Sequence, residues 1–366
     1  MNIGIDGSRA EGQKTGVGWY SYQILKNLSF LSQTDELKRD NFFIYTRKNL
    51  NISFPKNVFL KKLNWPLRFI WSHIRLNWEI LFHPIDVLFI PAASIPLFYF
   101  KKSVVTVHDL GFKRFPRAYS LFQRFYYNFV HFWNIKVANV IVTPSYFTKK
   151  EILKTYNVKS DKIKVCPLGY NKEDYKEKES LDIKKTLKKF NINQPYFLYV
   201  GRLEKKKNVL ELISSFNKFK VKYPKFKLVL VGSPGFGYKK IKPKIKKNKN
   251  ILKLGYVNIE DLPNLYAGAL AFIFPSLYEG FGIPVLESFA CGTPVILSES
   301  GSLKEVGGRA ALYFKPGQKD QLVALMEKMV NDKETYHALK KEAKKRVKNY
   351  SWQKCTLKIL NILKKL

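Results

Sequence analysis

The sequence predicts an α/β protein with two doubly wound domains, each a parallel sheet covered by helices on both faces. Short apolar runs alternate with helical patterns twice along the chain. A charged, apolar-poor segment, residues 171–194, separates the two series. The length of 366 residues exceeds what one ordinary core supports and suits two domains.

We expect an N-terminal domain over residues 1–170, a linker over 171–194, a C-terminal domain over 195–348 and a closing segment over 349–366. Ser351 is a suitable N-cap for a last helix that runs to about Leu363. The expected strands, in chain order, are 2–6, 42–46, 58–60, 87–90, 104–107, 140–143, 196–200, 227–231, one ending at 254–257, 271–274 and 294–297.

The chain is strongly basic, with 65 Lys and Arg against 28 Asp and Glu and a net charge of +37. This charge suits a polyanionic partner, either nucleic acid or an anionic membrane surface. The bases are spread over the entire chain, and no nucleic-acid reader motif is recognisable. We therefore expect no specific nucleic-acid partner, although a basic nucleic-acid-binding protein remains an alternative.

The cysteines and the apolar runs indicate the compartment. The three cysteines lie far apart and lack metal-ligand spacing, so we expect free thiols in a reducing compartment: Cys166, Cys291 and Cys355. The first residues contain no apolar signal core. The longest uncharged apolar run, 87–100, is broken by Pro91 and Pro96 and is shorter than the roughly 20 residues of a spanning helix. We expect a cytoplasmic protein, peripheral on the inner face of the cell membrane.

One stretch, residues 271–298, carries the strongest indication of a site. An apolar strand leads into a loop with Gly280 and Gly282 and then into a helix, an arrangement that leaves backbone N–H groups free for an anion. Glu279 and Glu287 bracket this loop, and Glu287 falls about one helical turn inside the helix. Taken alone, the pattern also fits a core strand, an ordinary turn and a solvated helix that carries two unrelated acids.

The residues around these glutamates resemble a family signature. The run EGFGIPVLE at 279–287 is similar to the motif of the retaining GT-B glycosyltransferases called glycosyl transferases group 1, in which seven residues separate two glutamates. PS at 275–276 and CGTPV at 291–295 are also usual in that family. The resemblance implies the GT-B fold, two Rossmann-like domains facing across a cleft, with the closing segment crossing back onto the first domain.

The resemblance also implies how a nucleotide-sugar donor is held. The run GRLEKKKN at 201–208 matches the family pattern that selects Arg202 and Lys207 for the diphosphate, while Lys205 and Lys206 fit surface charge equally well. Glu279 would bind sugar hydroxyls and Glu287 the ribose. The implied donor-binding set is Gly16, Gly18, Arg202, Lys207, Val257, Gly280, Phe281, Gly282 and Glu287.

Two features of the first half extend this site. The first strand is followed by a loop ending at Thr15 and by the glycines Gly16 and Gly18, which suits either a phosphate cradle or a plain tight turn. His108 and Asp109 directly follow a buried strand. A buried-edge histidine fits this position as well, but the resemblance implies that His108 contacts the transferred sugar and acts with Glu279 in catalysis.

Two stretches, 61–82 and 112–133, combine bases with aromatic residues; they contain Lys61, Lys62, Trp65, Arg68, Trp71, Arg75, Trp78, Lys113, Arg114, Arg117, Arg124, Tyr126, Tyr127 and Trp133. Basic aromatic helices can lie in a membrane interface. Alternatively, the aromatic residues belong to the core and the bases to a solvated face. Enzymes of the resembled family often dock this domain on a membrane that carries a lipid-linked acceptor.

Together these features predict a retaining hexosyltransferase of surface polysaccharide synthesis that needs no cofactor. The pattern looks most like bacterial mannosyltransferases, so GDP-mannose is the favoured donor, with a UDP-hexose possible, and the acceptor is a growing glycan or a lipid-linked glycan. We expect no metal site, because no two aspartates stand two apart as in the Asp-x-Asp motif. A GT-B-fold sugar-nucleotide epimerase remains a second alternative.

Overall fold

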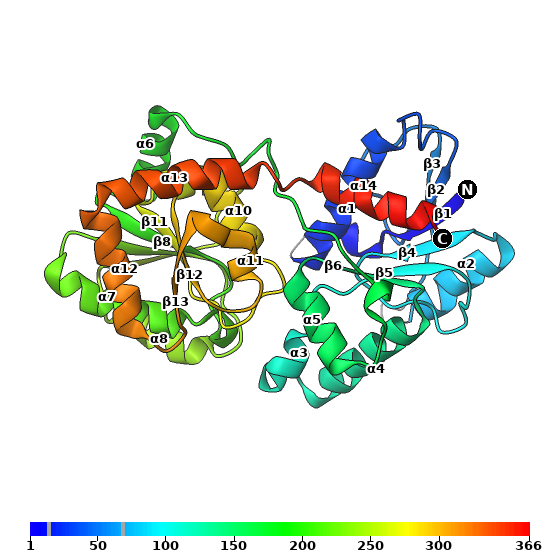
Figure 1. The fold of residues 1–366 in the computed structure, drawn as a ribbon, viewed down its shortest axis with the longest axis horizontal. Helices are drawn as coiled ribbons and strands as arrows, with labels where there is room; N and C mark the ends of the chain where they lie inside the picture. The colour runs from blue at the N-terminus through cyan, green and yellow to red at the C-terminus, as the bar shows by residue number, and fades with distance from the viewer. Residues whose placement is uncertain (13–15, 67–69) are drawn as a thin grey trace. The chain divides into compact units, whose positions relative to one another are not determined.

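The computed structural model describes residues 1–12, 16–66 and 70–366, and Thr15 and Arg68 named above lie outside these ranges. The chain divides into two compact units (Figure 1). The N-terminal unit comprises Met1–Gly169 together with Trp352–Leu366, and the C-terminal unit comprises Tyr170–Ser351. Each unit has its own parallel sheet, as the alternation of strands and helices predicts.

In the described part of the N-terminal unit, seven parallel strands form a sheet in the order β3-β2-β1-β4-β5-β6-β7. Ile3 of β1 pairs with Phe42 of β2 on one side and with Val87 of β4 on the other. The strand order therefore reverses beside β1. The strands are β1 (Asn2–Asp6), β2 (Asn41–Thr46), β3 (Val58–Lys62), β4 (Val87–Ile90), β5 (Ser103–Thr106), β6 (Val140–Thr143) and β7 (Ile163–Val165).

The longer helices pack on this sheet through their buried apolar residues. One buried cluster joins the sheet to the helices through Trp71, Leu76, Ile80 and Ile135. Helix α14 packs against α1. The helical segments are η1 (Ser8–Ala10), α1 (Val17–Leu31), η2 (Ser72–Leu76), α2 (Asn77–Phe82), α3 (Gly111–Arg114), η3 (Pro116–Ala118), α4 (Leu121–Val137), α5 (Tyr146–Thr155), η4 (Ser160–Lys162) and α14 (Trp352–Lys364).

The C-terminal unit has a parallel sheet of six strands in the order β10-β9-β8-β11-β12-β13. Tyr196 of β8 pairs with Lys227 of β9, and Phe197 pairs with Ala271 of β11. The order reverses between β8 and β11, so loops leaving these two neighbours begin at a topological switch point. The strands are β8 (Tyr196–Val200), β9 (Lys227–Val231), β10 (Ile251–Gly255), β11 (Ala271–Phe274), β12 (Val295–Ser298) and β13 (Ala311–Phe314).

The helices of this unit form two groups. Helices α6, α9, α10 and α13 contact one another in succession, as do α8, α7 and α12. The helical segments are α6 (Ser180–Lys189), η5 (Lys205–Lys207), α7 (Val209–Lys222), α8 (Tyr238–Lys246), α9 (Leu262–Ala267), α10 (Ile283–Ala290), α11 (Leu303–Gly307), η6 (Gly308–Ala310), α12 (Lys319–Asn331) and α13 (Lys333–Val347).

The strands expected from the sequence are present, with three differences. Helix α6 occupies part of the segment expected as a linker. It contains few apolar residues and packs against α9. Strands β7 and β13 were not predicted, because runs of three and four residues carry little periodicity. Strand β10 ends at Gly255, so Tyr256, which is 80% exposed, already belongs to the loop.

Candidate functional site

The phosphate-binding candidates and the first glutamate lie on opposite sides of the switch point in the C-terminal sheet. Arg202 and Lys207 follow β8, and Glu279 follows the neighbouring strand β11. The two loops are joined directly, since the Leu277 N–H donates to the Lys206 carbonyl at 2.9 Å. Such a position at the carboxyl ends of parallel strands is where open α/β sheets bind ligands.

Lys207 and Glu279 form a close ion pair. The Lys207 Nζ lies 2.5 Å from the Glu279 Oε1, and the two side chains are only 17% and 11% exposed. The ammonium group also lies 5.2 Å from the centre of the Phe274 ring. A cation and a carboxylate of low exposure are thus held at the switch point, where their electrostatic effects are stronger than in water.

Three buried serines hold the Glu279 loop. The Ser276 Oγ donates to the Glu279 Oε1 at 2.5 Å, and the Ser298 Oγ donates to the Ser276 carbonyl at 2.5 Å. The Ser302 Oγ lies 3.1 Å from the Glu279 carbonyl and 2.8 Å from the Phe281 carbonyl. Within the described residues, both side-chain bonds to Glu279 fall on Oε1, which leaves Oε2 for a ligand hydroxyl.

Gly301 allows the loop that follows β12 to lie close to Glu279. Its φ of +61° suits glycine, and a Cβ there would lie 2.5 Å from the Glu279 carbonyl oxygen. The sequence drew attention to Ser276 only as part of a motif and did not identify Ser298, Gly301 or Ser302. The signal for these three was their place at the end of β12 and in the loop that follows it, at the same edge of the sheet.

Arg202 is positioned differently from Lys207. Its side chain is 66% exposed, and its Nε lies 3.8 Å from the Glu204 Oε2, too far for a strong pair. Its backbone is fixed, because the Tyr199 hydroxyl donates to the Arg202 carbonyl at 2.8 Å and the Leu203 N–H donates to the Ser233 carbonyl at 2.9 Å. The guanidinium is therefore available to an anion while its attachment point is held.

The remaining residues of the loop shape the start of α10. Gly282 precedes this helix with a φ of +109°, and Pro284 stands in its first turn. Phe281 is 5% exposed, and its ring centre lies 5.8 Å from that of Tyr350. Its side chain therefore belongs to the core, and only its backbone could meet a ligand. Val257 is likewise buried, after the end of β10.

Glu287 lies in a separate tyrosine-lined setting on α10. The Tyr266 hydroxyl donates to its Oε2 at 3.0 Å, and Tyr175 also hydrogen-bonds to it. Burial raises the pKa of Glu287 to about 7, and the two hydroxyls oppose this rise. A buried carboxyl group with such a raised pKa is a candidate for a functional role, and Glu287 is therefore one.

We expect Glu287→Gln to stabilise the protein above neutral pH. The pKa of Glu287 is about 7 when folded and near its ordinary 4.5 when unfolded, so the folded state holds the extra proton between these values. Stability therefore falls as the pH rises through this window, by roughly 3 kcal/mol for this group. The difference in Tm between variant and wild type, measured by calorimetry, should grow from about pH 5 to about pH 8. A constant difference would contradict the assigned pKa.

In the N-terminal unit, His108 lies two residues after the end of β5 and is held by its neighbours. Its Nε2 lies 2.9 Å from the Pro91 carbonyl, and its ring packs edge-on against Tyr20 at 4.6 Å. Burial lowers the pKa of His108, which favours the neutral ring. A carbonyl can only accept, so Nε2 carries the hydrogen, and Nδ1 is then an acceptor.

The two glycines of the first loop lie at the start of α1, the helix that carries Tyr20. Gly16 precedes α1, and its carbonyl accepts from the Tyr20 N–H at 3.1 Å. Gly18 lies in the first turn of α1, where a Cβ would be 2.9 Å from the Arg9 carbonyl oxygen. The structure therefore places Gly16, Gly18 and His108 in the N-terminal unit, and it brings Lys207, Glu279 and the 280–282 loop together in the C-terminal unit.

Two family profiles match the chain. "Glycosyl transferases group 1" matches residues 182–346, and "Glycosyltransferase Family 4" matches residues 34–174. The chain belongs to the group 1 glycosyltransferases. It is therefore an enzyme of the retaining, nucleotide-sugar-dependent class, and a glycan is its acceptor class.

Among similar proteins, this glycosyltransferase is 28% identical to "O-antigen chain mannosyltransferase B" of Escherichia coli, over 96% of each chain. It is 29% identical to "O-antigen chain mannosyltransferase RfbU" of Salmonella typhimurium, over 84% of this chain and 85% of the other.

Solved structures support the GT-B fold. A sucrose-phosphate synthase from Thermosynechococcus elongatus matches with a TM-score of 0.78 at 18% identity, covering 100% of this chain and 98% of the other. HepE of Anabaena in complex with UDP and glucose matches with a TM-score of 0.76 at 16% identity, covering 100% and 99%.

The described part of the chain lacks both a metal-binding cluster and a membrane-spanning helix. In residues 1–12, 16–66 and 70–366, no three His, Cys, Asp or Glu side chains gather in a way that could hold a metal ion. Over the same ranges, every helix is too short or too polar to cross a membrane. The three cysteines are free and buried.

Proposed function

We propose that this glycosyltransferase transfers mannose from GDP-mannose to a growing or lipid-linked glycan of a surface polysaccharide. The Lys207–Glu279 pair at the switch point is the observation that carries the donor site, because it offers a cation and a hydroxyl-binding carboxylate at one place. The choice of mannose as the transferred sugar is supported by two relatives, both of which are named O-antigen mannosyltransferases. A UDP-hexose is the alternative donor.

In this proposal the diphosphate binds Arg202, Lys207 and the backbone amides of the 280–282 loop. Negative charge on the diphosphate grows as the sugar leaves, and cations in a site of low exposure stabilise that growth. These two cations supply the positive charge, so we propose that no metal is needed. The exposed Arg202 and the nearly buried Lys207 would act in sequence, the first capturing the anion and the second stabilising it.

The glutamates and the histidine would hold the sugar and the ribose. Glu279 would accept a sugar hydroxyl through Oε2, and Glu287 would accept from the ribose hydroxyls when ionised. His108 would contact the transferred sugar through Nδ1. Gly16 and Gly18 would present backbone to the substrates, and Val257 would present backbone to the base. We propose a front-face reaction in which the leaving phosphate helps to deprotonate the acceptor.

Titration with GDP, UDP and ADP, followed by the rise in Tm, tests the donor assignment. A ligand that binds only the folded state at about 100 times its Kd stabilises it by about 2.7 kcal/mol. We expect GDP to raise Tm at the lowest concentration. A larger response to UDP would favour a UDP-hexose, and no response to any nucleotide would contradict the donor site. Conversion of GDP-mannose without acceptor would instead support an epimerase.

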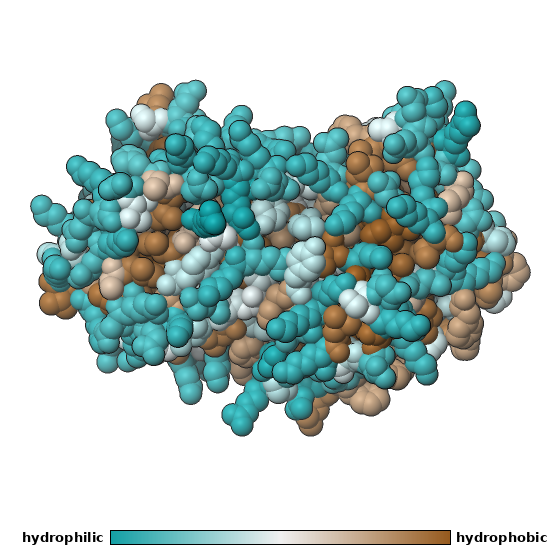
Figure 2. All heavy atoms as spheres, viewed as in Figure 1, coloured by the Kyte–Doolittle hydropathy of each residue, from teal (hydrophilic) through white to brown (hydrophobic). Residues whose placement is uncertain are grey.

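We also propose that helix α4 contacts an anionic membrane surface. One side of this helix leaves large apolar side chains in solvent: Leu121 79%, Phe122 73%, Phe125 74%, Phe129 43% and Phe132 54% exposed. The exposed bases Lys113 and Arg117 precede the helix. Figure 2 shows brown, apolar surface over the region of α4 among teal, polar atoms. Aromatic residues beside bases are typical of interfacial helices.

Replacing Phe122 and Phe125 together with serine should weaken binding to vesicles that contain phosphatidylglycerol by roughly 10-fold or more, because two large apolar groups no longer enter the interface. Co-sedimentation measures this change. Phe30→Ser is the matched control, since Phe30 is 67% exposed on α1, and it should bind like wild type. Equal loss in both variants would contradict the assignment to α4.

A further inference from the structure

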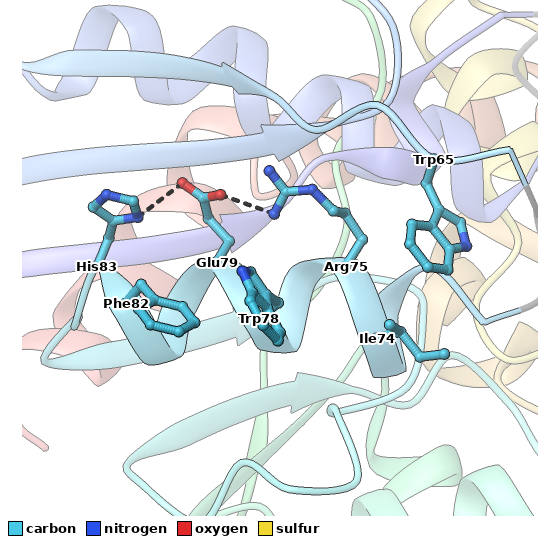
Figure 3. A pocket seen from close by; sticks show the side chains of 7 residues that line it. All are labelled: Trp65, Ile74, Arg75, Trp78, Glu79, Phe82 and His83. Carbon is cyan, nitrogen blue, oxygen red and sulfur yellow. Dashed lines mark hydrogen bonds and ion pairs between the residues drawn. The ribbon is translucent and has the colours of Figure 1, made fainter.

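A pocket of about 540 Å³ lies on the outer side of helix α2, apart from the residues assigned to the donor (Figure 3). Its walls are formed by Trp65, Ile74, Arg75, Trp78, Glu79, Phe82 and His83. Trp65 packs on the buried core of the unit from the loop that follows β3. The volume is within the usual range for a small-ligand site.

The helix that forms this pocket begins with a π-helical turn. Segment η2 is π-helical and continues directly into α2. π-helical turns are rare, and they occur frequently at functional sites. Residues spaced by four then form two parallel rows on the helix, one apolar (74, 78, 82) and one polar (75, 79, 83).

The polar row is a pre-arranged set of hydrogen-bonding groups. The Arg75 Nη1 donates to the Glu79 Oε2 at 2.9 Å, and the His83 Nδ1 lies 3.1 Å from the Glu79 Oε1 (Figure 3). Glu79 is only 12% exposed, while Arg75 is 26% and His83 73% exposed. Each carboxylate oxygen is thus fixed by a neighbour before any ligand arrives.

The apolar row offers ring faces to solvent. Trp78 is 61% exposed and Phe82 is 64% exposed, and their ring centres are 4.9 Å apart with a tilt of 43°. Ile74 is 45% exposed at the end of the row that is nearer to Trp65 (Figure 3). Large aromatic surfaces left in water are commonly binding surfaces.

The two rows together discriminate between possible ligands. A hydrocarbon chain would cover the aromatic row, but it would desolvate Arg75 and Glu79 and offer them no hydrogen bond. A phosphate would meet Arg75, but the Glu79 carboxylate already neutralises that guanidinium and repels an anion. A neutral sugar satisfies both rows, since its C–H face packs on a ring and its hydroxyls bond to the polar groups.

We propose that this pocket binds the neutral oligosaccharide portion of the acceptor, at a site separate from the sugar that receives the new residue. The inference rests on the proposed function, because it assumes a glycan acceptor of several sugars. Exposed rings in succession along the helix suit consecutive sugars of an extended chain. The pocket would therefore increase the affinity for long acceptors over short ones.

The test compares a linear α-linked mannotetraose with methyl α-mannoside. Saturation-transfer NMR without donor should show transfer from the aromatic protons of the wild-type protein to mannotetraose, and Trp78→Ala or Phe82→Ala should reduce this transfer. Under turnover, Trp78→Ala should raise the KM for mannotetraose by roughly 10-fold, with kcat and the KM for methyl α-mannoside unchanged. Trp78 is mostly exposed, so this change should not impair folding.

Phe30→Ala is the matched control, because Phe30 has a similar exposure, 67%, on a different helix. No transfer to mannotetraose, or an equal change for both acceptors, would overturn the proposal. Loss of binding to anionic vesicles in Trp78→Ala with full mannotetraose binding would assign the helix to a membrane instead. Failure of the proposed function is distinguishable, since mannotetraose binding without donor would persist even if GDP-mannose were not used.

Discussion

Lys207→Ala should lower kcat/KM for the nucleotide sugar by roughly 100- to 1,000-fold, the range typical of removing one preorganised electrostatic contact in a catalytic site. The Lys207 ammonium is 17% exposed and lies 2.5 Å from Glu279, so its charge acts in an environment of low exposure. The variant also leaves the nearly buried Glu279 carboxylate without its cation. Steady-state kinetics with GDP-mannose and a mannoside acceptor measure the change.

Arg202→Ala should lower kcat/KM by only about 10-fold, because the Arg202 side chain is 66% exposed and water screens its charge. Lys239→Ala is the matched control, since Lys239 is an exposed lysine of α8 in the same unit. Its kinetics should equal those of the wild type. Unchanged turnover in both Lys207→Ala and Arg202→Ala would remove the phosphate site.

Glu279→Gln should lower kcat/KM by roughly 100-fold or more, although the substitution preserves the shape of the side chain. The amide oxygen can still accept from Ser276 and Lys207. The amide nitrogen, however, replaces Oε2 and cannot accept a sugar hydroxyl. We expect most of the loss in kcat, because the contact is strongest as charge develops on the sugar.

Glu299→Gln provides the control for Glu279→Gln, because Glu299 is 28% exposed, pairs with Lys304, and has no assigned role. A Glu279→Gln enzyme with wild-type kcat would show that Oε2 does not contact the reacting sugar. Circular dichroism should confirm that both variants are folded, so that a loss of activity is not a loss of structure.

The sequence predicted the parallel sheets well because each core strand is a compact run of apolar residues. Strand β11 is fully buried, and its run from Ala271 to Phe274 carries no polar residue. Strand β7 and helix α6 escaped prediction for the opposite reason. The first is only three residues long, and the second buries only Thr186 among its ten residues. Their positions depend on packing rather than on periodicity.

The acidic and basic residues of the candidate site could be placed at strand ends from the sequence, because a motif joins them to the strands. The side chains that surround these residues could not be predicted in the same way. Ser298 and Ser302 reach the Glu279 loop from the end of another strand. Tyr175 contacts Glu287, although the two residues lie far apart in the sequence and share no local pattern.

 Such contacts form only when the chain has folded, because they join residues far apart in the sequence.

The two basic aromatic stretches illustrate the same limit. The sequence left open whether their aromatic residues belong to the core or to a surface, and the structure divides them. Trp71 is 2% exposed and belongs to the core, whereas Trp78, seven residues later, is 61% exposed. The rotation of each residue about the helix decides between these outcomes, and the π-helical turn at η2 shifts that rotation from the ordinary helical period.

Hydrogen–deuterium exchange of the wild-type protein with and without GDP tests the donor site most directly. Backbone amides that bind a phosphate exchange more slowly, so protection reports where the nucleotide sits. We predict that GDP protects peptides covering residues 201–208 and 279–287, the loops that follow β8 and β11, and that Lys207→Ala reduces this protection. Protection confined to other parts of the chain, with these two loops unchanged, would contradict the central claim.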